Sequence, residues 1–143
     1  MSKKTLGYFL PVLCWCLLIF VLSHQPKEES EQYSALAIWI LKLLGIDLNE
    51  WTMGNATLVI RKGAHITEYF ILTVLTLRWI RAEWGLTQKR LLLGVLFCVL
   101  YAASDEFHQT FISGRVGCTE DVLIDSIGIA LAGGLFSLFG QKK

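Results

Sequence analysis

The chain has 143 residues, enough for one domain, so residues 1–143 are predicted to form a single unit. Hydrophobic residues make up 54% of the sequence and charged residues only 17%, which is more apolar than a soluble domain needs for its core. The formal net charge of +1, without a basic stripe, a base-stacking motif or a zinc-ligand spacing, gives no reason to expect a nucleic-acid partner.

Four apolar runs, over residues 6–23, 64–80, 91–107 and 122–139, are close to the length that crosses a bilayer. Pro11 interrupts the first run, which a membrane helix tolerates when its neighbours satisfy the freed carbonyl. Lys3 and Lys4 before this run would also suit a cleaved signal peptide, but its length and the three later runs favour a retained span. The predicted fold is therefore all-α: a polytopic membrane protein with a four-transmembrane-helix bundle.

A fifth apolar stretch, over residues 33–44, lies between the first and second spans and is too short to cross. Gly45 follows it in a position that suits a helix C-cap. Tyr33, Trp39 and Trp51 are residue types that favour the membrane–water interface. We expect a short interfacial helix here.

The distribution of basic residues predicts the orientation of the four spans, because cytoplasmic loops of membrane proteins carry an excess of Lys and Arg. With both termini in the cytoplasm, that side holds one acid, Glu83, and eight of the 13 basic residues. The opposite side keeps five basic residues and 11 of the 12 acids. The cytoplasmic basic residues are Lys3, Lys4, Arg78, Arg81, Lys89, Arg90, Lys142 and Lys143. The predicted location is the cytoplasmic membrane, with both termini inside.

This topology brings most polar residues to the extracytoplasmic end of the bundle, among them all three histidines of the chain. Helical spacing aligns Arg61, His65 and Glu68 on one face of the second span, and Asp105 and His108 on one face of the third. The remaining polar residues predicted at this end include Ser23, His24, Gln25, Gln109, Arg115, Asp121 and Asp125.

The fourth span combines carboxylates with small residues on one face. Asp121 and Asp125 lie one turn apart, above Gly128 and Ala132, a spacing that lets membrane helices approach closely. We therefore expect the carboxylate face of this helix to be its packed face. The polar end would then form a cavity above an apolar bundle interior.

Two interpretations of these charges remain open from the residues. Lys62, Glu106 and Glu120 fit solvated anchors at helix ends, and an Arg61–Glu68 or Arg115–Asp121 pair would serve as structural glue. Ionisable groups inside membrane segments are costly, at about 2.5–3.5 kcal/mol each at central positions, and usually mark a functional site.

The four cysteines do not predict a disulfide. Cys14 and Cys16 point to different sides of one helix, Cys98 lies within the third span, and Cys118 is expected outside without a partner.

Three ordered motifs resemble the VanZ-like family of bacterial membrane proteins. The motifs are Arg61-Lys62-x-x-His65-x-x-Glu68-Tyr69, Tyr101-x-x-x-Asp105-Glu106-x-His108-Gln109-x-Phe111-x-x-Gly114-Arg115 and Asp121-Val122-x-x-Asp125-x-x-Gly128. Ser23-x-Gln25 is also similar to the family's pattern, and the resemblance covers roughly residues 6–139. Ser113 stands where proline is often expected and Asp125 where asparagine is frequent, so an obligatory catalytic carboxylate at position 125 is not implied.

The resemblance implies a multi-pass protein of the cytoplasmic membrane, in a family whose founding member is linked to resistance to teicoplanin, a glycopeptide antibiotic with a lipid tail. Kinship of the fold with enzymes that act on lipid head groups has been suggested. The leading hypothesis is an enzyme that cleaves or exchanges the head group of a phospholipid or polyprenyl-phosphate lipid at the outer face. The alternative is a non-catalytic protein that binds lipids or the lipoglycopeptide.

The head-group hypothesis gives roles to nine residues. His65 and His108 are the candidates for proton transfer or nucleophilic attack, with Glu68 and Asp105, three residues away, as their expected partners. The predicted substrate-binding residues, led by two arginines suited to phosphate, are Arg61, Gln109, Arg115, Asp121 and Asp125.

A metal-dependent enzyme and a transporter are two further hypotheses. A divalent metal bound by the histidines and carboxylates is possible but not favoured, because the neighbouring arginines would compete for the carboxylates. Transport is disfavoured, because four short spans without an inverted repeat do not suggest alternating access.

Overall fold

The computed structural model describes residues 3–139, and this part of the chain is helical, without a strand. The basic residues Lys142 and Lys143, which entered the prediction of orientation, lie outside the described residues. In chain order the helices are α1 (Lys3–Ser23), α2 (Lys27–Leu43), α3 (Leu48–Trp51), α4 (Ala56–Trp84), α5 (Gln88–Gln109) and α6 (Thr119–Phe139).

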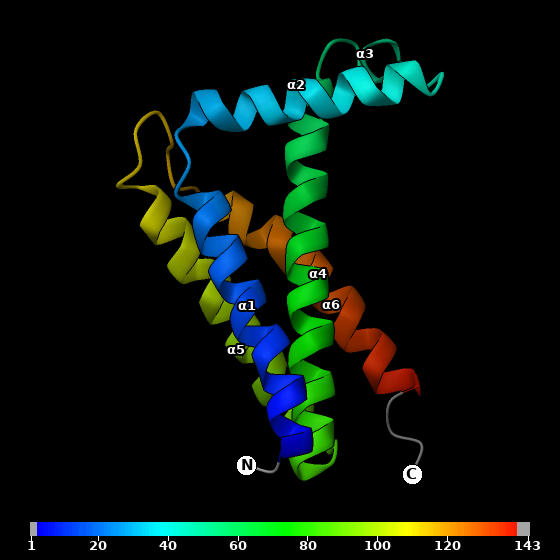
Figure 1. The fold of residues 1–143 in the computed structure, drawn as a ribbon, viewed down its shortest axis with the longest axis vertical. Coiled ribbons are helices and arrows are strands. Elements are labelled where there is room, and N and C mark those ends of the chain that lie inside the picture. Colours follow the sequence, from blue (N-terminus) through cyan, green and yellow to red (C-terminus); the bar gives the residue numbers. More distant parts are fainter. Residues whose placement is uncertain (1–2, 140–143) are drawn as a thin grey trace.

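Helix α4 is the centre of the bundle, since it contacts α1, α2, α5 and α6 (Figure 1). Helix α2 lies across one end of α4, roughly perpendicular to it, and we call this end of the molecule the α2 end. Helix α1 begins and α6 finishes at the opposite end. The loop between α5 and α6 returns to the α2 end, where the Lys27 N–H donates a hydrogen bond to the Ser113 carbonyl at 3.4 Å.

Three of the helices are long and apolar enough to cross a membrane: α1 from Thr5, α5 and α6. They carry large apolar side chains on their outer surfaces, such as Leu17 and Leu100, and a soluble monomer rarely exposes such surfaces. The chain is therefore a membrane protein by its helical composition. The predicted span over residues 64–80 lies inside α4, which is not one of these three, because polar residues such as His65, Glu68 and Arg78 lower its hydropathy.

The boundaries of the predicted helices differ from the observed ones where charged turns extend an apolar run. Helix α2 begins at Lys27 rather than at residue 33, and Glu28 and Glu29 in its first turn are favourable near a helix N-terminus. Its C-terminus follows the prediction. Gly45, at φ +85°, donates to the Lys42 carbonyl at 3.0 Å, and Ile46 donates to the Leu41 carbonyl at 2.9 Å. These two bonds form a Schellman motif, in which glycine adopts the left-handed conformation without strain.

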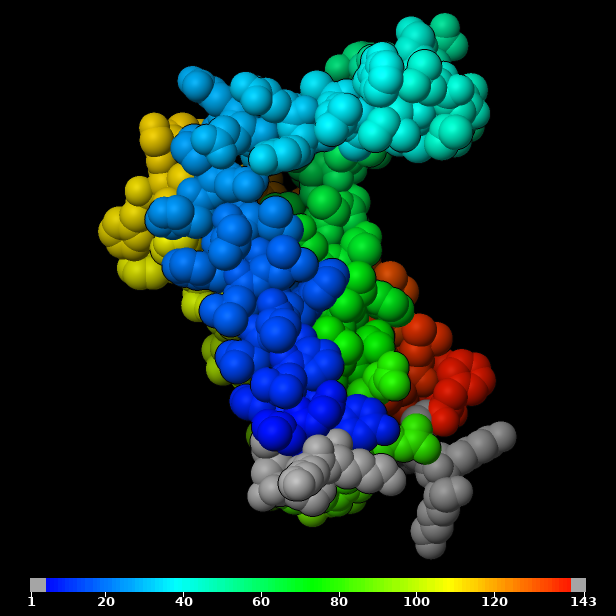
Figure 2. All heavy atoms as spheres, viewed as in Figure 1, coloured from blue at the N-terminus to red at the C-terminus, as the bar shows by residue number. Residues whose placement is uncertain are grey.

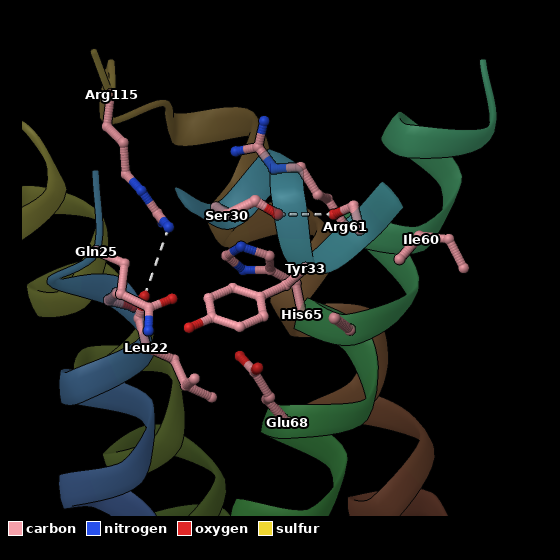
Figure 3. A pocket seen from close by; sticks show the side chains of 12 residues that line it. Leu22, Gln25, Ser30, Tyr33, Ile60, Arg61, His65, Glu68 and Arg115 are labelled. Carbon is pink, nitrogen blue, oxygen red and sulfur yellow. Dashed lines mark hydrogen bonds between the residues drawn. The ribbon is translucent and has the colours of Figure 1, made fainter. Parts of the chain in front are cut away.

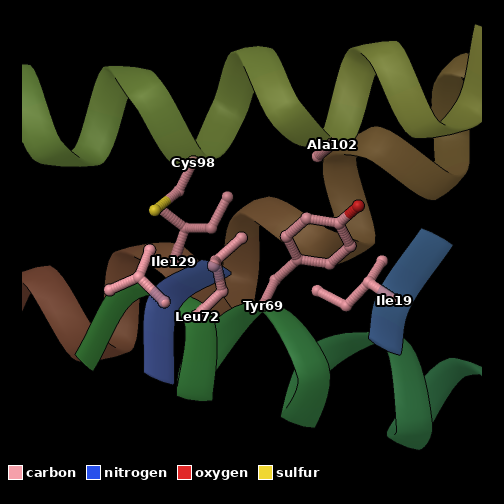
Figure 4. Close-up of a cluster of buried hydrophobic side chains, with 7 residues drawn as sticks. Ile19, Tyr69, Leu72, Cys98, Ala102 and Ile129 are labelled. Atoms are coloured by element: carbon pink, nitrogen blue, oxygen red, sulfur yellow. The ribbon is translucent and has the colours of Figure 1, made fainter. Parts of the chain in front are cut away.

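The bundle interior below the α2 end is apolar, as the sequence predicted. Tyr69 and Leu72 of α4 pack at its centre against side chains of α1, α5 and α6 (Figure 4). The buried residues of this cluster are Val12, Ile19, Tyr69, Leu72, Cys98, Ala102 and Ile129. A second cluster of Leu77, Ile80 and Leu91 closes the end where α4 turns into α5. The packing fixes α4 against three neighbours below the polar end.

Helices α4 and α6 touch through their backbones. A Cβ added at Gly128 would lie 2.1 Å from the carbonyl oxygen of Ile66, a distance at which one of the two helices must move. Gly128 and Ala132 are both buried, and so is Asp125 on the same face. The prediction that the carboxylate face of this helix is its packed face is confirmed.

Replacing Gly128 by alanine is expected to separate α4 from α6, because the new methyl group meets backbone rather than a flexible side chain. We expect a loss of stability of about 1–3 kcal/mol, the usual cost of overpacking. The measurement is the thermal unfolding of purified protein in detergent.

Gly134→Ala is the matched control, because a Cβ at Gly134 on the same helix has nothing within 4 Å. It should leave the unfolding temperature unchanged or raise it, since alanine is the better helix former. Equal unfolding temperatures for the two variants would contradict the close approach of α4 and α6.

Candidate functional site

The polar residues of four helices and one loop meet at the α2 end. Helix α4 supplies Arg61, His65 and Glu68 at steps of four and three, so that all three lie on the face turned towards the bundle. The C-terminal turn of α5, the N-terminal half of α6 and the end of α1 reach the same level. Here the chain buries Asp105, Glu106, Gln109 and Asp125, to exposed fractions of 0–5%.

Helix α6 meets the polar face of α4 through one contact. The His65 Nδ1 and the Asp125 Oδ1 lie 3.0 Å apart, which is a hydrogen bond and, with a protonated imidazole, an ion pair. Asp125 is fully buried, and its second oxygen, Oδ2, has no hydrogen-bond partner among the described residues. A carboxylate in this position fixes the imidazole ring and keeps one oxygen unused.

Gln109 connects the buried carboxylates of α5 to an arginine. Its Nε2 donates to the Asp105 Oδ2 at 3.3 Å and to the Glu106 Oε1 at 3.2 Å, while its Oε1 accepts from the Arg115 Nη1 at 3.1 Å. Ser23, at the end of α1, donates to the same Asp105 oxygen at 2.7 Å. Thus the side-chain network joins α1, α5 and the following loop.

The loop between α5 and α6 folds back onto the end of α5. The Cys118 N–H donates to the Glu106 Oε2 at 3.1 Å. A Cβ at Gly117 would lie 2.3 Å from the Glu106 carbonyl oxygen, so the close approach of this loop requires glycine. Both oxygens of the Glu106 carboxylate therefore have a donor, one from Gln109 and one from the loop backbone.

A polar cavity of about 190 Å³ lies between α1, α2 and α4 and reaches the loop that carries Arg115. Figure 3 shows His65, Glu68 and Tyr33 turned towards the same space, with the guanidinium groups of Arg61 and Arg115 at its rim. The cavity is lined by Leu22, Ser23, Gln25, Ser30, Tyr33, Ser34, Ile60, Arg61, Ala64, His65, Glu68 and Arg115. Helix α2 thus forms one wall of the cavity, at the α2 end.

Two guanidinium groups face this cavity without a carboxylate of their own. Among residues 3–139, neither Arg61 nor Arg115 has a carboxylate oxygen within 4.0 Å. Arg115 is held by Gln109 and by the Leu22 carbonyl, 3.5 Å from its Nη2, and its Nε has no partner in the described chain. Burial and the nearby Arg61 lower the pKa of Arg115, but an arginine remains a cation in proteins. The arrangement suits a bound anion.

An apolar groove of about 610 Å³ adjoins the polar cavity along α4. Ile60, Ala64 and Glu68 line both spaces, so the carboxylate of Glu68 stands where they meet. Trp15 of α1 and Ile71 of α4 line the apolar part. In the space-filling view the polar cavity opens as a recess between the ends of α1 and α4, beneath α2 (Figure 2).

The comparisons with known proteins assign a family. The sequence model of the VanZ/LLP1 family matches residues 8–140, nearly the whole chain. The chain belongs to the VanZ-like family. No curated protein and no solved structure matches it.

Within this VanZ-like chain, the nine predicted site residues fall into four places. Four line the polar cavity: Arg61, His65, Glu68 and Arg115. Asp105, Gln109 and Asp125 are buried and line none of the described cavities. Asp121 lies with Arg61, Lys62 and His65 on a small second cavity of about 90 Å³. Asp105, Gln109 and Asp125 therefore reach the cavity only through other side chains.

His108 lies apart from these residues. Its Nε2 is 3.4 Å from the Nδ1 of His24, and its ring stacks on Phe20 at a centroid distance of 4.7 Å. His108 does not line the polar cavity. The expected pairing of each histidine with the acid three residues away is wrong: His65 pairs with Asp125 from α6, and Asp105 pairs with Ser23 from α1.

Sequence reasoning missed two contributions to the site. Glu106 is 4% exposed and not a solvated anchor. The sequence held one signal for this: Glu106 follows Ala102 by four residues, so it shares a helix face with a small residue of the kind found where membrane helices pack closely. Helix α2 contributes Ser30, Tyr33 and Ser34 to the cavity wall. The four-residue step between the two serines places them on one helix face, but the arrangement of α2 over the bundle cannot be read from that spacing.

Ser23→Ala is expected to destabilise the protein, because it removes a buried donor to the Asp105 carboxylate. Leaving a buried acceptor with one donor fewer costs about 1–3 kcal/mol. Thermal unfolding in detergent measures the loss.

Ser104→Ala is the control, since Ser104 is exposed and its hydroxyl donates to the Tyr101 carbonyl of its own helix, at 2.7 Å. It should unfold at the wild-type temperature. A Ser23→Ala variant as stable as Ser104→Ala would show that the network does not hold α1 to α5.

Proposed function

We propose that this VanZ-like chain is a membrane enzyme that cleaves or exchanges the head group of a phospholipid or polyprenyl-phosphate lipid at the outer face of the cytoplasmic membrane. The observation that carries the proposal is the pairing of two adjoining spaces of opposite character. One space presents two guanidinium groups that have no carboxylate partner within residues 3–139, and the other is an apolar groove along α4. A lipid phosphate needs both.

The polar cavity supplies binding for the phosphate. Arg61 and Arg115 approach it from α4 and from the α5–α6 loop, so a phosphate between them would be contacted from two sides. Arginine forks match phosphate oxygens in a bidentate manner. Removing such a phosphate from water is compensated by the two charges, which have no carboxylate partner within residues 3–139.

Glu68 and His65 face the cavity. A proton acceptor and a proton donor in these positions fit acid–base catalysis of phosphoester transfer. In the proposed step, the hydroxyl of water or an acceptor alcohol attacks phosphorus and gives its proton to Glu68. The bond from phosphorus to the leaving head-group oxygen breaks, and that oxygen takes a proton from the His65 imidazolium. Asp125 stabilises this imidazolium through the 3.0 Å contact with Nδ1.

The proposed orientation places the α2 end outside the cell. Helices α1, α4, α5 and α6 then cross the membrane, and α2 lies in the interface. Helix α4 has 29 residues and is about 43 Å long, more than the hydrocarbon thickness of about 30 Å, so its charged first turns extend past the apolar layer. The exposed Tyr33, Trp39 and Leu43 on α2 support its interfacial position.

The orientation predicts which engineered thiols react in intact cells. In a Cys118→Ser background, a cysteine at Val116 in the α5–α6 loop should react with a membrane-impermeant thiol reagent, since Val116 is 86% exposed. A cysteine at the exposed Lys89, beside the α4–α5 turn, should react only after the membrane is opened. The reverse pattern would overturn the orientation.

The catalytic proposal predicts that substitution of His65 abolishes most of the activity, whereas substitution of His108 does not. Protein reconstituted in bilayers meets a panel of phospholipids and polyprenyl phosphates, with serine and ethanolamine as acceptors, and mass spectrometry follows the head groups. His65→Gln and Glu68→Gln should each lower the rate by about 100-fold or more, as the loss of acid–base catalysis requires. His108→Gln should retain activity, because His108 lies with His24 outside the cavity.

Loss of activity in the His108 variant alone would assign the catalytic role to His108, the second of the two histidines that the sequence suggested, and overturn the role of His65. An absence of turnover on every lipid, with folded protein, would favour the alternative function: binding of a lipid or a lipid-tailed glycopeptide antibiotic of the teicoplanin type without reaction. The apolar groove accommodates such a tail equally well, and the lipid would then be recovered bound but unchanged.

A further inference from the structure

We propose that His65, Glu106 and Asp125 bind one divalent transition-metal ion. Each of the three residues offers one ligand atom, and these atoms lie within 4.8 Å of one another. A bound ion such as zinc holds nitrogen and oxygen ligands at about 2.0–2.2 Å, so a short closure of the three side chains would bring them into coordination. The ligands come from α4, α5 and α6, and the ion would link all three helices.

The free oxygen of Asp125 is an independent observation that points to a ligand. Asp125 is fully buried, yet its Oδ2 has no hydrogen-bond partner among the described residues. A buried acceptor without a donor costs about 1–3 kcal/mol, and more when it is charged. A cation beside this oxygen would remove that cost.

The ionisable side chains around His65, Glu106 and Asp125 carry an excess of negative charge, which also favours a bound cation. Glu68, Asp105, Glu106 and Asp125 are buried or half-buried, and the Asp125 carboxylate lies within electrostatic range of the other three. Asp121 adds a fifth carboxylate, which acts on Glu106 and Asp125, and Lys62 lines the small cavity beside it. The three cations Arg61, Lys62 and Arg115 offset three of these five carboxylates, which leaves an excess of two negative charges when all are ionised and His65 is neutral. A divalent cation supplies that charge.

The surroundings of the three ligands resemble the outer shell of a metal site. The two Glu106 oxygens accept hydrogen bonds from Gln109 and from the Cys118 N–H, which fixes the carboxylate plane. Contacts of this kind orient metal ligands and are nearly as important as the ligands themselves. His65 also lines both polar cavities, so the ion has a route from outside.

The donor set indicates the class of ion. An imidazole nitrogen with two carboxylates suits Zn²⁺ or Mn²⁺, whereas Mg²⁺ and Ca²⁺ prefer oxygen ligands throughout. Three protein ligands with an open position are the composition of a catalytic rather than a structural zinc site. Binding does not rest on the proposed head-group activity. If both hold, His65 would be a metal ligand and not the proton donor. The ion would supply Lewis-acid stabilisation of the leaving oxygen, and Glu68 would accept the proton of the attacking hydroxyl and return it to that oxygen.

The test is metal binding by the full chain in detergent, after removal of metals with a chelator. Mn²⁺ and Zn²⁺ are added separately, bound metal per chain is measured by mass spectrometry, and the loss of the free Mn²⁺ signal is followed by electron paramagnetic resonance. Wild type should bind one ion per chain, and its unfolding temperature should rise on binding. Asp125→Asn, Glu106→Gln and His65→Gln should each weaken metal binding by about 100-fold. Adding metal should then leave the unfolding temperature of each variant unchanged.

The matched control is the double variant His24→Gln with His108→Gln. These two imidazoles lie 3.4 Å apart and would bind a transition metal adventitiously. The double variant should bind like wild type. Wild-type protein that takes up no ion overturns the proposal, as does binding that survives all three ligand variants or disappears in the double variant.

These readouts separate the metal site from the proposed function. Protein that binds Mn²⁺ with the expected variant pattern but changes no lipid supports the site and contradicts the enzyme. Protein that turns over a lipid at an undiminished rate in excess chelator, and takes up neither ion, supports the enzyme and contradicts the site.

Discussion

The approach of α4 and α6 at Gly128 determines the rest of the polar end. In lipid, helices gain little from the hydrophobic effect and associate through close packing, which small residues permit. Gly128 lets α6 come within contact of the Ile66 carbonyl, and Asp125 stands one turn away on the same face. His65 precedes Ile66, so the backbone contact and the His65–Asp125 bond are parts of one junction. A wider separation of the helices would leave Asp125 buried without its imidazole.

The second junction consists of hydrogen bonds rather than apolar contacts. Gln109 donates to two carboxylates and accepts from Arg115, and it thereby fixes an arginine in a loop against a helix. Ser23 adds α1 to the same network. Buried polar networks of this kind stabilise a structure when each member has a partner and are costly otherwise. The position of Arg115 in the cavity wall therefore depends on the buried network of Gln109, Asp105 and Glu106 behind it.

The sequence predicted the helices and the sides on which they pack, because both depend on periodicity within one segment. The apolar runs located α1, α5 and α6, and the three- and four-residue steps placed His65 and Glu68 on one inner face. The partners of these residues could not be predicted, because they come from other helices. The sequence of α5 does not show that Asp105 accepts a hydrogen bond from Ser23 of α1, or that His108 lies beside His24. The burial of Glu106 likewise depends on a loop that returns through Gly117.

The apolar groove beside Glu68 runs along α4 between the polar cavity and the level of Ile71. A ligand whose tail fills it would arrive by lateral diffusion within the leaflet and not from the aqueous phase. Occupancy of the site would then follow the mole fraction of that lipid in the membrane. Adding inert lipid would lower the occupancy even when the total concentration of the ligand lipid in the sample stays constant. The occupancy of the site would depend on the fraction of that lipid in the membrane, and it would not depend on how much membrane the cell contains.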